Sequence, residues 1–289
     1  MSANQASLPA STEKGASRFN LNWVFYIILI VMMVFFLVPV YVAVVTALKG
    51  MEEVSRGNPW SLPVSPTLAN FGNAWELLKN GFINSVILSV PGVAISSVLG
   101  SLNGYVLSKW KFRGSNTIFT LLLFGMFIPY QSVLIPLVQF LQSIQLFATI
   151  PGLILVHVVY GIPIVTLIFR NYYAGVPNEL VESGTIDGAG FFGIYRHIVL
   201  PVSIPAFVVV LIWQFTAIWN EFLFAVTLNS NPATQPITVA LAGLGSSQAG
   251  TDYGMQMAGS LITALPTLLV YIFLSRYFIR GLLAGSVKG

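Results

Sequence analysis

The sequence contains no cysteine and only two histidines among its 289 residues. Disulfides, thiolate nucleophiles and cysteine-ligated metals are therefore excluded, and two imidazoles leave little material for a metal site. Charged residues are also scarce, at 8% of the chain, whereas a soluble domain carries about 25%. So few charges cannot cover a surface that faces water, and 56% of the residues are hydrophobic. We therefore expect a chain embedded in membrane lipid.

Several catalytic and nucleotide-binding patterns are missing as well. The sequence has no Gly-x-x-x-x-Gly-Lys-Ser/Thr phosphate loop, no His-Glu-x-x-His and no Gly-x-Ser-x-Gly. It follows that the chain does not bind ATP through a phosphate loop, and we expect no cofactor bound by this chain and no enzymatic activity. The basic residues cluster only at Lys109, Lys111 and Arg113, so no nucleic-acid partner is expected.

The sequence does contain long apolar runs. A membrane-spanning helix needs about 20 mostly apolar residues, and six segments meet that length. They cover about residues 23–48, 82–107, 116–141, 150–169, 201–228 and 257–279. The sequence thus predicts an all-α, polytopic membrane protein with six transmembrane helices. Prolines within several of these runs predict kinks, because each removes a backbone donor.

The distribution of Lys and Arg predicts the orientation. With the amino terminus in the cytoplasm, the cytoplasmic segments hold 10 of the 13 basic residues: Lys14, Arg18, Lys109, Lys111, Arg113, Arg170, Arg196, Arg276, Arg280 and Lys288. The other three lie in the first outer loop, where three acids balance them. Since basic residues concentrate on the cytoplasmic side, both termini are expected there.

The domain organisation is simple. Residues 1–22 are predicted to form a polar cytoplasmic tail, and the first apolar run after them is too long for a cleaved signal peptide. Residues 23–289 form one membrane domain. In its second span, Gly100 and Gly104 form a small-xxx-small pair, which suits close helix packing within the chain, a subunit interface or a substrate path.

The connection between the fourth and fifth spans, at about residues 171–200, is unusually long. Asn178 is a plausible N-cap for a short helix that carries acidic residues in its first turns, and Gly188 is a plausible stop. By the charge distribution, this helix lies in the cytoplasm.

The motifs of this loop resemble a known family. They are Glu182-Ser183-Gly184, Asp187-Gly188-Ala189 and Ile198-Val199-Leu200-Pro201. This pattern and its spacing are similar to the cytoplasmic "EAA" loop of binding-protein-dependent ABC importer permeases. The departure is Ser183-Gly184 where Ala-Ala is usual, and Gly184 is expected to weaken the helix by about 1 kcal/mol.

Two further stretches resemble the carbohydrate-uptake, MalG-like branch of that family. The first is Trp219-Asn220-Glu221-Phe222, and the second is the carboxyl-terminal run Gly281-Leu282-Leu283-Ala284-Gly285-Ser286-Val287-Lys288-Gly289. The whole resemblance covers about residues 23–289.

The resemblance implies the type I permease fold, a location in a bacterial cytoplasmic (inner) membrane, and a role in sugar import. The loop helix would act as a coupling helix through Glu182, Ser183, Gly184, Asp187, Gly188 and Ala189. The tail would contact the ATPase through Ala284, Gly285, Lys288 and Gly289. The implied partners are a second, MalF-like permease subunit, an ATPase dimer that holds ATP and magnesium, and a periplasmic or lipid-anchored sugar-binding protein.

Glu221 is the only acid within an apolar run, and a carboxylate at such a place suggests function. It is a candidate for the substrate path together with Trp219, Asn220, Gln214 and Gln131. A structural carboxylate bonded to a neighbouring helix is the alternative. His157, in the fourth span, is interpreted as a packed residue rather than a proton relay.

Two other classes of protein compete with the permease interpretation. An ion-coupled secondary transporter would carry coupling carboxylates near the midplane, more spans and an internal repeat, and the sequence offers one acid, six spans and no inverted repeat. A membrane enzyme would need a paired carboxylate site or a nucleophile motif, and neither occurs.

Overall fold

The computed structural model describes residues 22–110, 112–244 and 252–286. This part of the chain is helical throughout, with no β-strand. The elements follow one another as α1 (Asn22–Ala47), α2 (Met51–Arg56), α3 (Ala69–Lys109), α4 (Ser115–Phe124), η1 (Gly125–Phe127), η2 (Tyr130–Val133), α5 (Leu134–Ser143), α6 (Ile150–Ala174), α7 (Glu179–Ile186), α8 (Phe191–Ile194), η3 (Tyr195–Val199), α9 (Leu200–Val202), α10 (Ile204–Trp219), α11 (Leu223–Leu228), η4 (Pro232–Thr234), α12 (Ile237–Leu244) and α13 (Tyr253–Ser286). The predicted tail at 1–22 lies almost wholly outside the described residues.

Four of these helices are long and apolar enough to cross a membrane by themselves. The number becomes six if each of two sharply bent pairs counts as one span. The first pair joins Ser115–Phe127 to Tyr130–Ser143 at 89°, and the second joins Phe191–Val202 to Ile204–Trp219 at 76°. The described residues thus establish a multi-pass, all-helical membrane architecture.

Several predicted boundaries were wrong. The second span begins 13 residues before the predicted residue 82, because α3 starts at Ala69. Its first turns are amphipathic, with Ala74 and Leu78 buried on one face, so they were too polar to be recognised as part of a span. The predicted third span is bent near Pro129, and the predicted fifth span ends at Trp219, with α11 following after a break.

The small-residue pair of α3 packs against α6. A Cβ added at Gly100 would lie 2.3 Å from Val165 Cγ1, and one at Gly104 would lie 2.8 Å from the backbone nitrogen of Arg170. The two backbones approach this closely only because neither position has a side chain. Of the three roles that the sequence left open for this pair, packing within the chain is the one observed.

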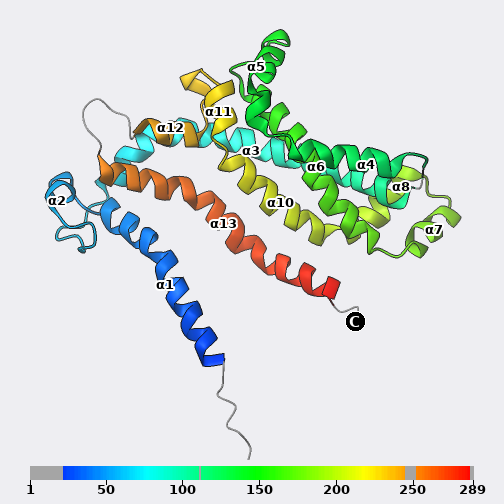
Figure 1. Ribbon diagram of the computed structural model, residues 1–289, viewed down its shortest axis with the longest axis horizontal. Helices are drawn as coiled ribbons and strands as arrows, with labels where there is room; N and C mark the ends of the chain where they lie inside the picture. Colours follow the sequence, from blue (N-terminus) through cyan, green and yellow to red (C-terminus); the bar gives the residue numbers. More distant parts are fainter. Residues whose placement is uncertain (1–21, 111, 245–251, 287–289) are drawn as a thin grey trace, which may run out of the picture.

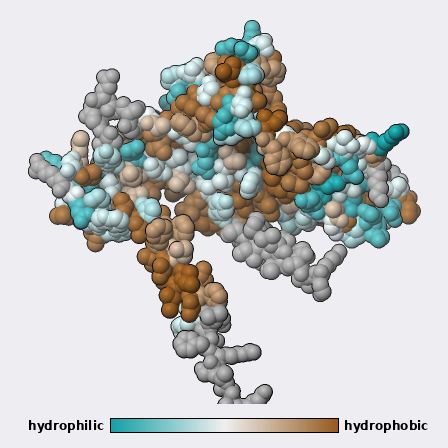
Figure 2. Space-filling view, viewed as in Figure 1, coloured by the Kyte–Doolittle hydropathy of each residue, from teal (hydrophilic) through white to brown (hydrophobic). Residues whose placement is uncertain are grey.

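The helices form an elongated body from which α1 departs (Figure 1). Only the carboxyl-terminal end of α1 is buried, where it meets α13, and the rest carries a continuous apolar surface (Figure 2). Phe36, for example, is 71% exposed. A surface of this kind is stable in lipid or against another apolar surface, and not in water.

Candidate functional site

The predicted coupling helix is present as α7, at the end of the molecule far from α2 (Figure 1). It follows α6 after a short turn that contains Gly175 and Val176. It ends at Ile186, and Gly188 follows two residues later with a φ of +82°, in the left-handed region that glycine adopts without strain. The chain then returns towards the membrane helices through α8, η3 and α9. The expected sequence of helix, glycine turn and return is therefore confirmed.

The first turn of α7 is held by the carboxyl-terminal end of α3. Lys109 Nζ donates to the carbonyl oxygen of Val176 and, over 2.8 Å, to Asn178 Oδ1. Asn178 occupies the N-cap position as predicted, but its side chain makes no capping bond and accepts from Lys109 instead. The side-chain oxygen of Asn178 accepts from Lys109, which lies 69 residues earlier in the chain, so no local sequence pattern could predict this contact.

Gly184 faces inward from α7. A Cβ at this position would lie 2.6 Å from Ile198 Cδ1, so the missing side chain lets α7 lie close against the return segment. The helix is continuous through Gly184 in spite of the low helix propensity of glycine. Packing against Ile194 and Ile198 accounts for that, because tertiary contacts override propensity.

The outward face of the same loop is free of such contacts. Glu182, Ser183 and Asp187 are exposed, as are two large apolar side chains, Ile186 at 85% and Phe192 at 72%. Within the described residues no hydrogen bond or ion pair engages the carboxylate of Glu182. Gly188 is also exposed and Ala189 half-buried, so of the six predicted loop residues only Gly184 is buried.

An aromatic and hydroxyl cluster joins the return segment to the membrane helices. The ring of Tyr105 in α3 lies 5.0 Å from that of Phe191 and 5.6 Å from that of Tyr195. Ser101 Oγ bonds the hydroxyls of Tyr173, at 2.7 Å, and Tyr195, at 3.0 Å. Sequence reasoning missed this cluster, because its members come from three distant segments and share no local pattern. A π-helix over Tyr195–Val199 carries one of them.

The second candidate region is the break after α10. Glu221 lies between α10 and α11, and its carboxylate accepts from the backbone nitrogens of Phe224, at 2.7 Å, and Ala225, at 3.1 Å. These are the free donors of the first turn of α11, so the side chain acts as its cap. The carbonyl of Glu221 accepts from Thr238 Oγ1 over 2.9 Å, which ties the break to α12.

The remaining predicted path residues surround this break on different sides. Trp219 is buried, stacks on Phe215 and donates from Nε1 to the carbonyl of Thr263 in α13 over 2.9 Å. Gln214 is also buried, and its Nε2 lies 3.4 Å from the carbonyl of His157. Asn220 and Gln131 are exposed, the latter at the bend between α4 and α5. The structure brings Gln214 and Glu221 together against α6, and places Trp219 against α13.

His157 of α6 lies next to Glu221, a contact that was not predicted from the sequence. Its Nε2 lies 4.0 Å from Glu221 Oε2, and both side chains are largely buried. The sequence held no signal for this pair, because the two residues belong to spans whose relative rotation no local pattern fixes.

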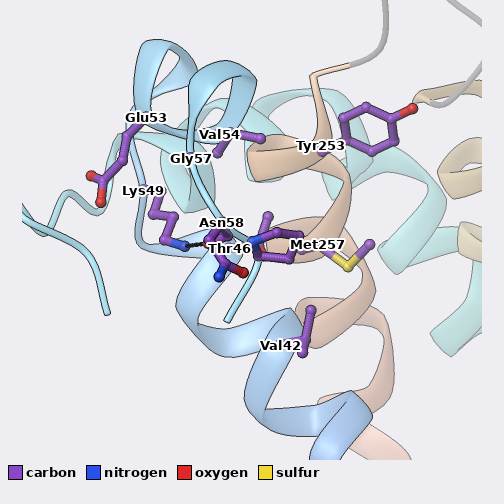
Figure 3. Close-up of a pocket in the computed structure, with 10 residues that line it drawn as sticks. Val42, Thr46, Lys49, Glu53, Val54, Gly57, Asn58, Tyr253 and Met257 are labelled. Carbon is purple, nitrogen blue, oxygen red and sulfur yellow. Dashed lines mark hydrogen bonds between the residues drawn. The ribbon is translucent and has the colours of Figure 1, made fainter. Parts of the chain in front are cut away.

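A cavity lies apart from both regions, between α1, α13 and the segment that joins α1 to α3. It has a volume of about 320 Å³ and is lined by α1, the loop after it and α13 (Figure 3). Lys49 extends along its wall, with Nζ donating to the carbonyl of Asn58 over 2.9 Å and to Ser61 Oγ over 3.2 Å. The bonds of Lys49 therefore hold the segment of Asn58 and Ser61 against the end of α1.

The structure describes only part of the predicted carboxyl-terminal tail. Ala284 and Gly285 lie in the last turns of α13, and Lys288 and Gly289 lie outside the described residues. Among the residues described, no group of three His, Asp or Glu side chains is placed to hold a metal ion.

The chain is similar in sequence and fold to subunits of known import systems. The chain is 40% identical to the xylose/arabinose import permease protein XacI of Haloferax volcanii, over 89% of this chain and 90% of the relative. It is 31% identical to the arabinooligosaccharides transport system permease protein AraQ of Bacillus subtilis, over 88% and 91% of the two chains. It also matches a chain in the crystal structure of a bacterial ABC transporter involved in the import of alginate. That match has a TM-score of 0.76 and 20% identity, and covers 90% of this chain and 98% of the other, which shows a shared fold.

A family model described as "binding-protein-dependent transport system inner membrane component" matches residues 92–282, which include both the loop of α7 and the break at Glu221. The chain therefore belongs to this family of ABC importer permeases.

Proposed function

We propose that this chain is a permease subunit that moves a mono- or oligosaccharide across the cytoplasmic membrane, driven by ATP hydrolysis on a separate ATPase subunit. The observation that carries the proposal is the exposed surface of the α7 loop, where carboxylates and large apolar side chains lie together at the end of a membrane-spanning helix. Interfaces combine apolar anchors with peripheral charges in this way.

In this proposal the ATPase binds α7. Glu182 pairs with a basic residue of the ATPase, while Ser183 and Asp187 contribute polar contacts on the same face. Gly184 keeps α7 seated on the return segment, and Gly188 with Ala189 provides the turn. Because Lys109 and the cluster around Ser101 fasten this loop to α3 and α6, a displacement of α7 would be passed to the membrane helices.

The carboxyl-terminal tail would make a second contact with the ATPase. Ala284 and Gly285 continue α13 beyond its apolar part, and Lys288 with Gly289 would reach the ATPase dimer interface. ATP and magnesium would be bound there, by the partner and not by this chain.

Sugar as the substrate class rests on the relatives, whose names specify xylose and arabinose, and arabinooligosaccharides. The exposed amides of Asn220 and Gln131, together with the carboxylate of Glu221, are the proposed polar groups of the path. Trp219 and Gln214 are both buried, and they would hold the helices that line the path in position.

The proposed topology has six spans, counting each bent pair as one, with both termini in the cytoplasm. The expected location is a bacterial cytoplasmic membrane. The proposed assembly adds a second permease subunit, two ATPase subunits and an extracytoplasmic sugar-binding protein. An ion-coupled secondary transporter is the alternative, and membership of the ABC importer family argues against it.

The test is purification of the tagged chain from its native host in mild detergent, followed by mass spectrometry and reconstitution. We expect an ATPase subunit and a second permease to co-purify, and the reconstituted complex to take up a pentose or its oligomers only with ATP inside. Purification of the chain alone, with uptake driven by an ion gradient, would overturn the proposal.

A further inference from the structure

The buried pair of His157 and Glu221 is held just short of contact. The separation of 4.0 Å between Nε2 and Oε2 exceeds the reach of a hydrogen bond. His157 is 6% exposed, and among the residues that the structure describes its Nε2 finds no hydrogen-bond partner. A buried polar atom left unpaired is costly, so its persistence calls for an explanation such as a second state in which it is satisfied.

Glu221 is already engaged on its other side. Both carboxylate oxygens accept backbone bonds from the first turn of α11, so the side chain fixes how α11 begins after the break. Oε2 has a lone pair free for a second donor beside the backbone nitrogen of Ala225, which lies 3.1 Å away. Contact with His157 would therefore connect α6 to the first turn of α11 through one carboxylate.

The helix that carries His157 also leads to the coupling loop. α6 is continuous from Ile150 to Ala174 and is followed directly by the turn that Lys109 holds. Packed helices move as units and shift by 1–2 Å between discrete arrangements, which is enough to close a gap of 4.0 Å to a hydrogen bond. His157 and Glu221 therefore lie near the amino-terminal end of α6, and the carboxyl-terminal end of α6 leads to the loop that would bind the ATPase.

We propose that His157 is a positioning residue for Glu221, whose Nε2–H donates to Glu221 Oε2 in the other transport state and so relays the position of α7 to the break after α10. This inference rests on the proposed function, since it assumes that an ATPase moves α7.

The first experiment is a double-mutant cycle in the reconstituted complex. His157→Leu removes the donor, and His157→Gln retains an N–H on a side chain of similar reach. We expect His157→Leu to lower the maximal uptake rate roughly tenfold, with His157→Gln within about threefold of wild type. In a Glu221→Gln background, His157→Leu should have less than about twofold further effect. Val159→Ala, on the exposed face of the same helix, is the control for general perturbation of α6.

A packing role predicts other results. If His157→Gln is as slow as His157→Leu, or if the effects at 157 and 221 multiply independently, the proposal is wrong. Co-purification of the ATPase with each variant is measured alongside, so that loss of docking is separated from loss of relay.

The second experiment does not depend on sugar uptake. Thermal midpoints of the wild type, His157→Leu, Glu221→Gln and the double variant, each in complex, give the coupling between the two positions with and without a trapped ATP analogue. We expect no coupling in one state and a clear, non-additive shift in the other. Equal coupling in both states would overturn the relay, whereas an absence of sugar uptake by the wild-type complex would count against the proposed function alone.

Discussion

At the scale of single residues, the acidic side chains differ in what their oxygens bond. Glu53 accepts from the backbone nitrogen of Val64 over 2.9 Å, Glu76 pairs with Lys79, and Glu221 caps α11. Glu182 is exposed, and within the described part of the chain its carboxylate makes no hydrogen bond or ion pair. In a chain with only nine acids, an exposed carboxylate without a bond, on the loop that follows a membrane helix, is well placed to meet another protein.

Glu182→Ala is expected to weaken binding of the ATPase. The expected loss is about 1 kcal/mol, or roughly fivefold in Kd, which is the lower bound for a residue that dominates an interface. The measurement is co-purification of the ATPase, with titration of purified subunits to obtain the Kd. Glu52→Ala, at an exposed acid of α2, is the matched control and should leave binding unchanged. Equal retention of the ATPase by both variants would remove Glu182 from the docking surface.

Sequence reasoning located the loop residues but not their partners. The motif predicted a short helix stopped by Gly188, and the structure confirms a helix that ends at Ile186 with a glycine turn at Gly188. It did not predict that Asn178 would accept from Lys109, or that Glu221 would lie beside His157. Both contacts join separate helices, and their geometry depends on the relative rotation of those helices, which periodicity along one segment does not specify.

At the scale of elements, proline was an ambiguous guide to breaks. Pro91 and Pro163 lie inside continuous helices, whereas the chain bends by 89° near Pro129. In an apolar environment a proline leaves a free carbonyl that neighbours can satisfy, so the packing around it decides whether the helix continues. The sequence predicted six apolar segments correctly as helical, but it did not distinguish straight spans from bent ones.

The contact of α3 with α6 depends on the absence of a side chain at Gly104. Gly104→Ala is expected to destabilise the protein by about 1–3 kcal/mol, because the new Cβ would meet the backbone of α6 at 2.8 Å. Gly72→Ala lies in the same helix with nothing within 4 Å, and it should be neutral or stabilising by up to about 1 kcal/mol. Thermal unfolding of the two purified variants gives the comparison. Similar midpoints would show that α3 and α6 can separate without cost.

The end of α13 offers a prediction for a second element. Deletion of residues 284–289 is expected to lower ATP hydrolysis stimulated by the sugar-loaded binding protein, while the remaining apolar part of α13 keeps the chain in the membrane. Hydrolysis by the reconstituted complex is measured with and without the sugar, and the unstimulated rate serves as the internal control. Stimulation at the wild-type level would exclude the tail from coupling.

At the scale of the whole molecule, two groups of basic residues lie at opposite ends of the fold. Lys109 and Arg170 bond around the end that carries α7, and Lys49 and Lys79 lie in the segments at the opposite end. The membrane potential and the insertion machinery favour Lys and Arg on the cytoplasmic side. The orientation inferred from the sequence, in which α7 and both termini are cytoplasmic, stays a prediction.

The absence of native cysteine makes this orientation directly measurable, because a single introduced cysteine is the only thiol in the chain. A membrane-impermeant maleimide added to intact spheroplasts is expected to label Ser65→Cys and Ser143→Cys, which are exposed in the two outer connections. Thr185→Cys, exposed on α7, should react only after permeabilisation. Labelling of Thr185→Cys in intact spheroplasts would invert the topology and place α7 out of reach of any cytoplasmic ATPase. Labelling of Ser65→Cys without Ser143→Cys would instead show that the bent pair around Pro129 enters and leaves the membrane on one side, so that the chain has fewer than six spans.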